Sequence, residues 1–100
     1  MESKIKAYLG FAIRSGNVVF GYDNLIVSKK TPLLTLICKS QNEKVTNKVL
    51  NFCEKKNIEC IKLDIVLGEM IGRNCKVIGV FDKNLAAAII NELKMENENK

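Results

Sequence analysis

The sequence predicts a single α/β domain in which helices cover both faces of a central sheet, and three observations support this. A chain of 100 residues with 47% hydrophobic content suffices for one globular core but not for two domains. Apolar residues at helical spacing alternate along the chain with short continuous apolar runs. These runs are too short for helices and are typical of strands buried on both faces. We expect a three-layer α-β-α sandwich with a mixed sheet of about four strands over residues 1–94, followed by a polar, frayed tail over residues 95–100.

The first helix is predicted over residues 2–14 from one apolar face, formed by Ile5, Tyr8, Leu9, Ala12 and Ile13. Gly16 and Gly21 then bracket a very short apolar strand, residues 18–20, at two points that favour positive φ. A second helix is predicted from Tyr22 to about Lys30, and Pro32 ends it. The apolar run over residues 33–38 is then predicted to be a central strand buried on both faces.

The middle of the chain continues the alternation. Ser40 and Glu43 have the spacing of a capping box, which predicts a helix that starts there, runs to residue 56 and is closed by Asn57. The partly alternating residues 58–63 are predicted to form a strand with one less protected face.

The last third is predicted to contain a short helix over residues 67–71, ended by Gly72, and another buried strand over residues 76–81. Asp82 is suited to cap a final helix. Binding in open sheets gathers where adjacent loops meet at one end of the strands. The connections at residues 14–24 and 72–76 both carry glycines and cations, so they are the candidates to meet there.

The charge distribution favours a polyanionic partner such as nucleic acid. The formal net charge is +5, but residues 91–100 carry three glutamates and two lysines, so residues 1–90 carry +6. Lysines and arginines that neutralise phosphates release condensed counterions, which drives binding. A lysine-rich surface that serves only solubility is the alternative interpretation.

The four cysteines show no metal or catalytic pattern. Their spacing contains no C-x-x-C motif and the chain contains no histidine, although four separate elements could in principle supply zinc ligands. We interpret the four as small buried hydrophobic residues in a reducing compartment: Cys38, Cys53, Cys60 and Cys75. We expect no metal and no cofactor. General acid/base and nucleophilic roles also lack candidates, so we expect no enzymatic activity.

No segment of the sequence predicts membrane insertion or export. The longest apolar runs are far shorter than the roughly 20 residues that span a bilayer. The first residues are mixed and charged rather than a basic head followed by an apolar middle. We expect a cytoplasmic protein.

Five segments recur along the chain in a fixed order: residues 9–16, residues 19–24, the apolar strand with Ser40, residues 67–73 and residues 77–82. In this order and at these separations they resemble the L-seven-Ae/L-thirty-e family of kink-turn RNA-binding ribosomal proteins, especially its short bacterial YlxQ-like members. The likeness spans roughly residues 3–93. The resemblance implies a three-layer α-β-α fold and a ribonucleoprotein function without catalysis, in which the protein grips a sharply bent RNA with tandem G·A pairs. We expect a bacterial monomer whose partner is the ribosome or a folded regulatory RNA.

The resemblance also implies an RNA-binding edge made by the connection at residues 14–24, the helix after it and the loop at Arg73. The residues we assign to it are Arg14, Asn17, Gly21, Tyr22, Asp23, Asn24, Lys30, Met70, Ile71, Arg73 and Lys76. Arg73 and Lys76 would contact phosphates. Met70 and Ile71 would pack on an unstacked nucleotide, unless they belong to the core. Tyr22 has the same two alternatives, and the turn residues could serve only to cap the chain.

The sequence departs from the family pattern at the base-reading positions. Family members usually carry a glycine, one residue, a polar pair such as Asn-Glu, and a lysine three positions further on. This chain has Gly21 followed by Tyr22, but its polar pair is Asp23-Asn24 and Val27 replaces the lysine. Lys30, one turn along the predicted helix, is the candidate substitute. A protein-interaction module that has kept the fold but lost base recognition is therefore the alternative function.

Overall fold

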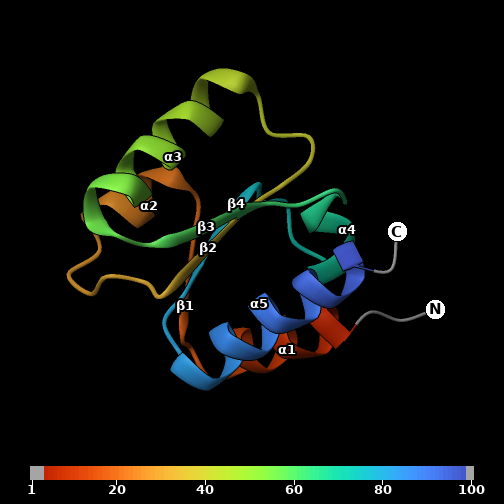
Figure 1. The fold of residues 1–100 in the computed structure, drawn as a ribbon. Helices are drawn as coiled ribbons and strands as arrows, with labels where there is room; N and C mark the ends of the chain where they lie inside the picture. Colours follow the sequence, from red (N-terminus) through yellow and green to blue (C-terminus); the bar gives the residue numbers. More distant parts are fainter. Residues whose placement is uncertain (1–3, 99–100) are drawn as a thin grey trace.

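The computed structural model describes residues 4–98 as a four-stranded sheet between two layers of helices (Figure 1). The helices are α1 (Lys4–Arg14), α2 (Tyr22–Val27), α3 (Glu43–Lys56), α4 (Leu67–Ile71) and α5 (Lys83–Glu98). The strands are β1 (Val18–Phe20), β2 (Leu34–Ile37), β3 (Glu59–Lys62) and β4 (Val77–Val80). The predicted α/β fold with a mixed, four-stranded sheet is therefore confirmed.

The strands lie in the order β1-β4-β2-β3. β2 and β3 are parallel, whereas β4 runs antiparallel to both of its neighbours. Phe20 of β1 pairs with Ile78, and Ile37 of β2 pairs with Val77. The carboxyl ends of β1, β2 and β3 therefore lie at the same end of the sheet as the start of β4, which is where binding sites of open α/β sheets usually form.

Each face of the sheet has its own hydrophobic core. Successive side chains of a strand point to opposite faces, so Leu34 and Leu36 of β2 pack with α1, α4 and α5, whereas Ile37 packs with α2 and α3. Every residue of β2 and β4 is buried, which explains why both strands consist of apolar residues apart from Thr35 and Gly79. Figure 1 shows α2 and α3 on one side of the sheet and α1 and α5 on the other.

Two helix boundaries differ from the prediction. α2 ends at Val27 because Ser28 has extended backbone (φ −64°, ψ 134°), so the predicted extension to about Lys30 is wrong. The predicted capping box of Ser40 is also wrong. Asn42 is the N-cap of α3, and its Oδ1 accepts a hydrogen bond from the backbone N–H of Val45 at 2.8 Å.

Other boundary signals are confirmed. Asn57 closes α3 in the left-handed region (φ 58°), and Gly72 closes α4 with φ 68°. The Oδ1 of Asp82 accepts from the backbone N–H of Leu85 at 2.9 Å, as expected of a helix cap. α5 continues to Glu98, so residues 95–98 of the predicted tail are helical, and residues 99–100 lie outside the described residues, as do residues 2–3 of the first predicted helix.

Gly79 lets two layers approach closely at the centre of the sheet. A Cβ atom there would lie 2.9 Å from Cγ1 of Val19 and 3.0 Å from Cδ1 of Leu25. The missing side chain therefore allows α2 to pack directly on β4, which fixes the position of the α2 turn relative to the sheet.

None of the helices within residues 4–98 combines the length and the apolar character that a membrane span requires.

Candidate nucleic-acid interface

The two glycine-bearing connections singled out from the sequence meet at one end of the sheet. The backbone N–H of Gly21 donates to the carbonyl oxygen of Val77 at 2.8 Å. The guanidinium carbon of Arg73 lies 4.7 Å from the centroid of the Phe20 ring. We call the surface formed by residues 20–24 and 72–76 the two-loop edge. It joins the turn before α2 to the loop after α4.

The turn before α2 depends on Gly21. Its φ of 84° and ψ of 155° form a conformation that residues with a side chain rarely adopt, and its carbonyl oxygen accepts from the backbone N–H of Leu25 at 3.0 Å. Asp23 and Asn24 follow on the exposed surface. The Nδ2 of Asn24 donates to the carbonyl oxygen of Phe20 at 2.9 Å, which fixes the amide and leaves its Oδ1 as the group available to a ligand.

The loop after α4 folds back tightly on its own helix. Gly72 donates to the carbonyl oxygen of Gly68 at 2.9 Å, and Cys75 donates to that of Arg73 at 2.9 Å. A Cβ atom at Gly68 would lie only 2.6 Å from the carbonyl oxygen of Arg73. The absence of a side chain at position 68 is therefore what allows Arg73 to occupy its position.

Arg73 is exposed and available for an anionic ligand. Its guanidinium carbon lies over the Phe20 ring, a cation–π contact that attracts the cation to this ring. The planar guanidinium carries five N–H donors in a fork, which suit bidentate contact with a phosphate or with a guanine edge.

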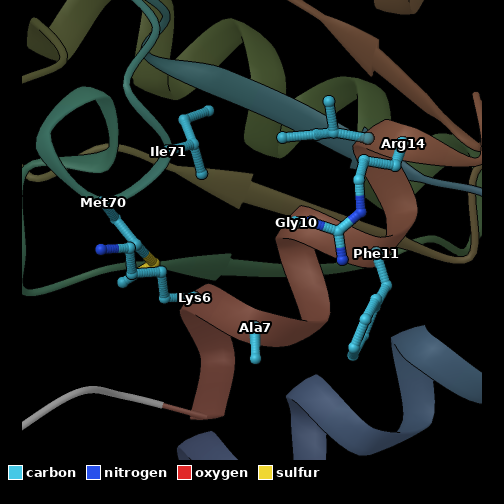
Figure 2. Close-up of a pocket in the computed structure, with 8 residues that line it drawn as sticks. Lys6, Ala7, Gly10, Phe11, Arg14, Met70 and Ile71 are labelled. Carbon is cyan, nitrogen blue, oxygen red and sulfur yellow. The ribbon is translucent and has the colours of Figure 1, made fainter.

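A second feature lies beside the two-loop edge: a groove of about 440 Å³ between α1 and α4 (Figure 2). The α1 residues that line it are Lys6, Ala7, Gly10, Phe11, Ile13 and Arg14. From α4 come Met70 and Ile71, and Figure 2 shows Lys6 and Met70 at one end with Arg14 and Phe11 at the other. We call this feature the α1–α4 groove.

Three predicted site residues lie in the α1–α4 groove rather than at the two-loop edge. Arg14 is exposed, and its guanidinium carbon lies 4.9 Å from the centroid of the Phe11 ring. Met70 and Ile71 are half-buried and pack against the core beneath α1 and α5, yet they also line the groove. The alternative that these two residues belong to the core is therefore confirmed in part, and their packing on a nucleotide stays a prediction.

The remaining predicted residues divide into structural and exposed groups. Tyr22 is half-buried and packs against the core beneath α2 and α3. Asn17 donates to the Oγ of Ser15 at 3.0 Å, and its carbonyl oxygen accepts from the N–H of Phe81 at 2.8 Å, so it joins α1 to the end of β4.

Lys76 is exposed in the loop before β4. Lys30 is exposed but lies beyond the end of α2, so the premise that it continues a helix face is wrong.

Sequence reasoning missed several residues of this region. Lys6, Gly10 and Arg14 recur every four residues, a spacing that places them on one helix face, and this signal was available. Phe20 was identified only as apolar, because nothing local in the sequence indicates which loop will cover it. The importance of Gly68 likewise depends on a contact with the loop that follows α4.

The cysteines are free, and within residues 4–98 no three acidic, cysteine or histidine side chains are grouped to hold a metal. Burial raises the pKa of the Cys38 thiol, but hydrogen bonds from Ser40 and the backbone outweigh it and lower this pKa. A hydrogen bond with Cys60 lowers the pKa of Cys53 to about 7, against the effect of burial. The same interaction raises the pKa of Cys60. Cys38 and Cys53 are buried as expected, whereas Cys60 and Cys75 are only half-buried, and Cys75 alone of the four belongs to the two-loop edge.

Comparison with known proteins supports the fold alone. No family model and no curated protein matches the chain. A solved structure described as that of a protein with unknown function from Bacillus halodurans C is similar to it, with a TM-score of 0.82. The two chains share 22% sequence identity over 93% of this chain and 99% of the other. This likeness shows a shared architecture at nearly full length of both chains.

Proposed function

We propose that the chain is a non-enzymatic, cytoplasmic, ribosome-associated protein that binds structured RNA of the kink-turn type as a monomer. The observation that carries the proposal is the contact of Arg73 with Phe20, which brings an exposed cation to the turn that presents Asp23 and Asn24. The resemblance of the sequence to the kink-turn-binding family points to the same edge. The excess of positive charge over residues 1–90 favours a polyanion.

The turn before α2 offers hydrogen-bond acceptors. The carboxylate of Asp23 accepts only, and the amide of Asn24 has committed its Nδ2 to the backbone of Phe20. Two acceptors side by side suit the amino and imino donors of guanine rather than the acceptor atoms N7 and O6. We infer that Asp23 and Asn24 contact the guanines of G·A pairs, while Arg73 and Lys76 contact the backbone.

The test is a titration with two RNAs at several salt concentrations. One contains a kink-turn, and in the other Watson–Crick pairs replace the tandem G·A pairs. We expect at least about tenfold tighter binding to the kink-turn RNA, a difference of about 1.4 kcal/mol. Equal, weak and strongly salt-dependent binding to both RNAs would reduce the proposal to nonspecific attraction between a basic protein and a polyanion.

A specific observation favours protein interaction as a second candidate function. Val27 is 73% exposed and Ile26 is 42% exposed on α2, where the family pattern expects a lysine. Apolar surface beside a polar turn is typical of contacts between proteins. Val27→Lys separates the two candidates: an RNA-binding edge should gain a phosphate contact and a steeper salt dependence. An edge made for a protein should gain no RNA affinity from this change.

A further inference from the structure

Two cysteines, one from α3 and one from β3, meet on the same face of the sheet. The buried residues of α3 are Thr46, Val49 and Cys53, which form the side of the helix that faces the sheet. Ile58, just before β3, belongs to the core beneath α2 and α3. Because side chains of an extended chain alternate between faces, Cys60 points to this face as well, and it packs against the core to which Cys53 belongs. The two thiols therefore lie between the helix and the strand.

The chain passes from α3 to β3 through a short turn (Figure 1). Asn57 closes the helix in the left-handed region, and the N–H of Ile58 donates to the carbonyl oxygen of Cys53 at 2.8 Å. Within residues 4–98, β3 is an edge strand that pairs with β2 alone. A strand held from one side shifts more easily than a central strand. This arrangement permits the small movement that a bond between the two sulfur atoms requires.

The surroundings of the pair favour a thiolate on Cys53. The hydrogen bond with Cys60 lowers the pKa of Cys53 to about 7, against the effect of burial. Thr35 lies beside Cys60 in the register of β2 and β3, and its buried hydroxyl has no hydrogen-bond partner of ordinary geometry among the described residues. This hydroxyl also interacts with the Cys53 thiol and lowers its pKa. Since the thiolate is the form that reacts with oxidants, Cys53 is the more reactive member of the pair.

The sheet separates this pair from the other two cysteines. Cys38 and Cys75 pack in the core beneath α1, α4 and α5, on the opposite face. A bond between one cysteine of each core would have to cross the sheet. Cys53 is 1% exposed, whereas Cys60 is half-buried on the edge strand, so a small oxidant reaches the pair from the side of Cys60.

We propose that Cys53 and Cys60 are a site of oxidative modification, at which hydrogen peroxide converts the two thiols into a disulfide that thiol reductants reopen. The Cys53 thiolate attacks one peroxide oxygen, the O–O bond breaks, and the released hydroxide takes up a proton and leaves as water. The Cys60 thiol then attacks the sulfenic acid on Cys53, which forms the S–S bond and releases a second water. Two electrons pass from the thiols to the peroxide. This modification does not depend on the RNA-binding function proposed above.

The test exposes the folded, reduced full chain to hydrogen peroxide and counts its thiols after unfolding in denaturant. We expect the count to fall from four to two and to return to four after treatment with dithiothreitol. Lys55 and Lys56 lie between the two cysteines, so trypsin places them in separate peptides, 49–55 and 57–62, that only a disulfide joins. Mass spectrometry should detect this joined pair. A count that stays at four, or a disulfide between any other two cysteines, would overturn the proposal.

Two variants and a control test the order of events. Cys60→Ser keeps a hydroxyl that can donate to the Cys53 thiolate but cannot form the S–S bond. In this variant the sulfenic acid should persist on Cys53, where dimedone labels it, and Cys53→Ala should lose both the label and the disulfide. Cys75→Ala, which removes a half-buried cysteine of the opposite core, is the matched control and should form the disulfide at the original rate. Dimedone labelling of Cys60 in Cys53→Ala would overturn the assignment of Cys53 as the attacking thiol.

The disulfide should also stabilise the folded chain. Closing residues 53–60 into a ring restricts the unfolded state, so the oxidised chain should unfold at a higher urea concentration than the reduced chain. Cys60→Ser treated with peroxide should show no such shift. A lower midpoint for the oxidised chain would overturn the conclusion that the fold accommodates the bond. No RNA enters these measurements, so a failure of the proposed function would leave their outcome unaffected.

Discussion

Gly10 and Gly68 allow one substitution to be compared in two environments. Both are half-buried helical glycines, so alanine at either position gains about 0.5–1 kcal/mol from reduced backbone entropy of the unfolded chain and better helix propensity. At position 10 a Cβ atom has open space, with its nearest neighbour at 3.9 Å. At position 68 it would lie 2.6 Å from the carbonyl oxygen of Arg73, and a backbone atom cannot move aside cheaply. We therefore expect Gly10→Ala to stabilise the fold.

The helix contributions of the two substitutions differ by at most about 1 kcal/mol, so the difference between the variants mainly reports the overcrowding at Gly68. Overpacking typically costs about 1–3 kcal/mol. In urea unfolding followed by circular dichroism, the unfolding free energy of a small domain falls by about 1–3 kcal/mol per M of urea. The unfolding midpoints of the two variants should therefore differ by on the order of 1 M urea. Gly68→Ala should unfold at the lower urea concentration. Equal midpoints would refute the conclusion that the missing side chain at position 68 holds the Arg73 loop in place.

Three further predictions concern the two-loop edge, the start of α3 and the thiol pair. Arg73→Ala should weaken RNA binding and reduce the slope of log affinity against log salt by about 1, measured by titration at several ionic strengths; an unchanged slope would mean that this guanidinium contacts no phosphate. Asn42→Ala should lower the unfolding free energy by about 1 kcal/mol, whereas Ser40→Ala should leave the helix cap intact; the reverse order in urea unfolding would restore Ser40 as the cap. Because the pKa of Cys53 is lowered to about 7, folding releases its proton above that pH, and under reducing conditions the unfolding free energy should rise from pH 7 to 9. The stabilisation by Cys53 is lost as pH falls through 7, and the raised pKa of Cys60 opposes the rise in stability above pH 9. Cys60→Ala should remove the pH dependence between 7 and 9. A stability profile that Cys60→Ala leaves unchanged would contradict the conclusion that the hydrogen bond with Cys60 lowers the pKa of Cys53.

Short-range sequence signals were enough to predict most of the helices and strands. The buried strands are apolar apart from Thr35 and Gly79, and Gly72, Asn57 and Asp82 end or begin helices as their conformational preferences indicate. These signals succeed because each depends on neighbours within four residues. The wrongly predicted N-cap of α3 was a choice between two similar residues, because Ser40 and Asn42 can both cap a helix. Only the path of the backbone decides which of the two side chains faces the free N–H groups of the first turn.

The candidate site was less accessible from sequence because it depends on strand order. Gly21 and Arg73 were identified as members of one surface, but the contact through Phe20 requires β1 to lie next to β4, which no local pattern encodes. Lys30 was assigned from a helix that ends three residues earlier. The α1–α4 groove was missed because a glycine on a helix face indicates space only when the opposite wall is known.

The pairing of β1 with β4 has a consequence for biosynthesis. β1 is complete at residue 20, but its hydrogen-bonded neighbour ends only at residue 80, so this closure spans most of the chain. Contacts of such long sequence separation form late during folding because the intervening segment must first be ordered. A nascent chain that has emerged only through α3 carries Phe20 and Asp23 without Arg73. The two-loop edge therefore forms only after residues 72–76 have been synthesised and β4 has paired with β1.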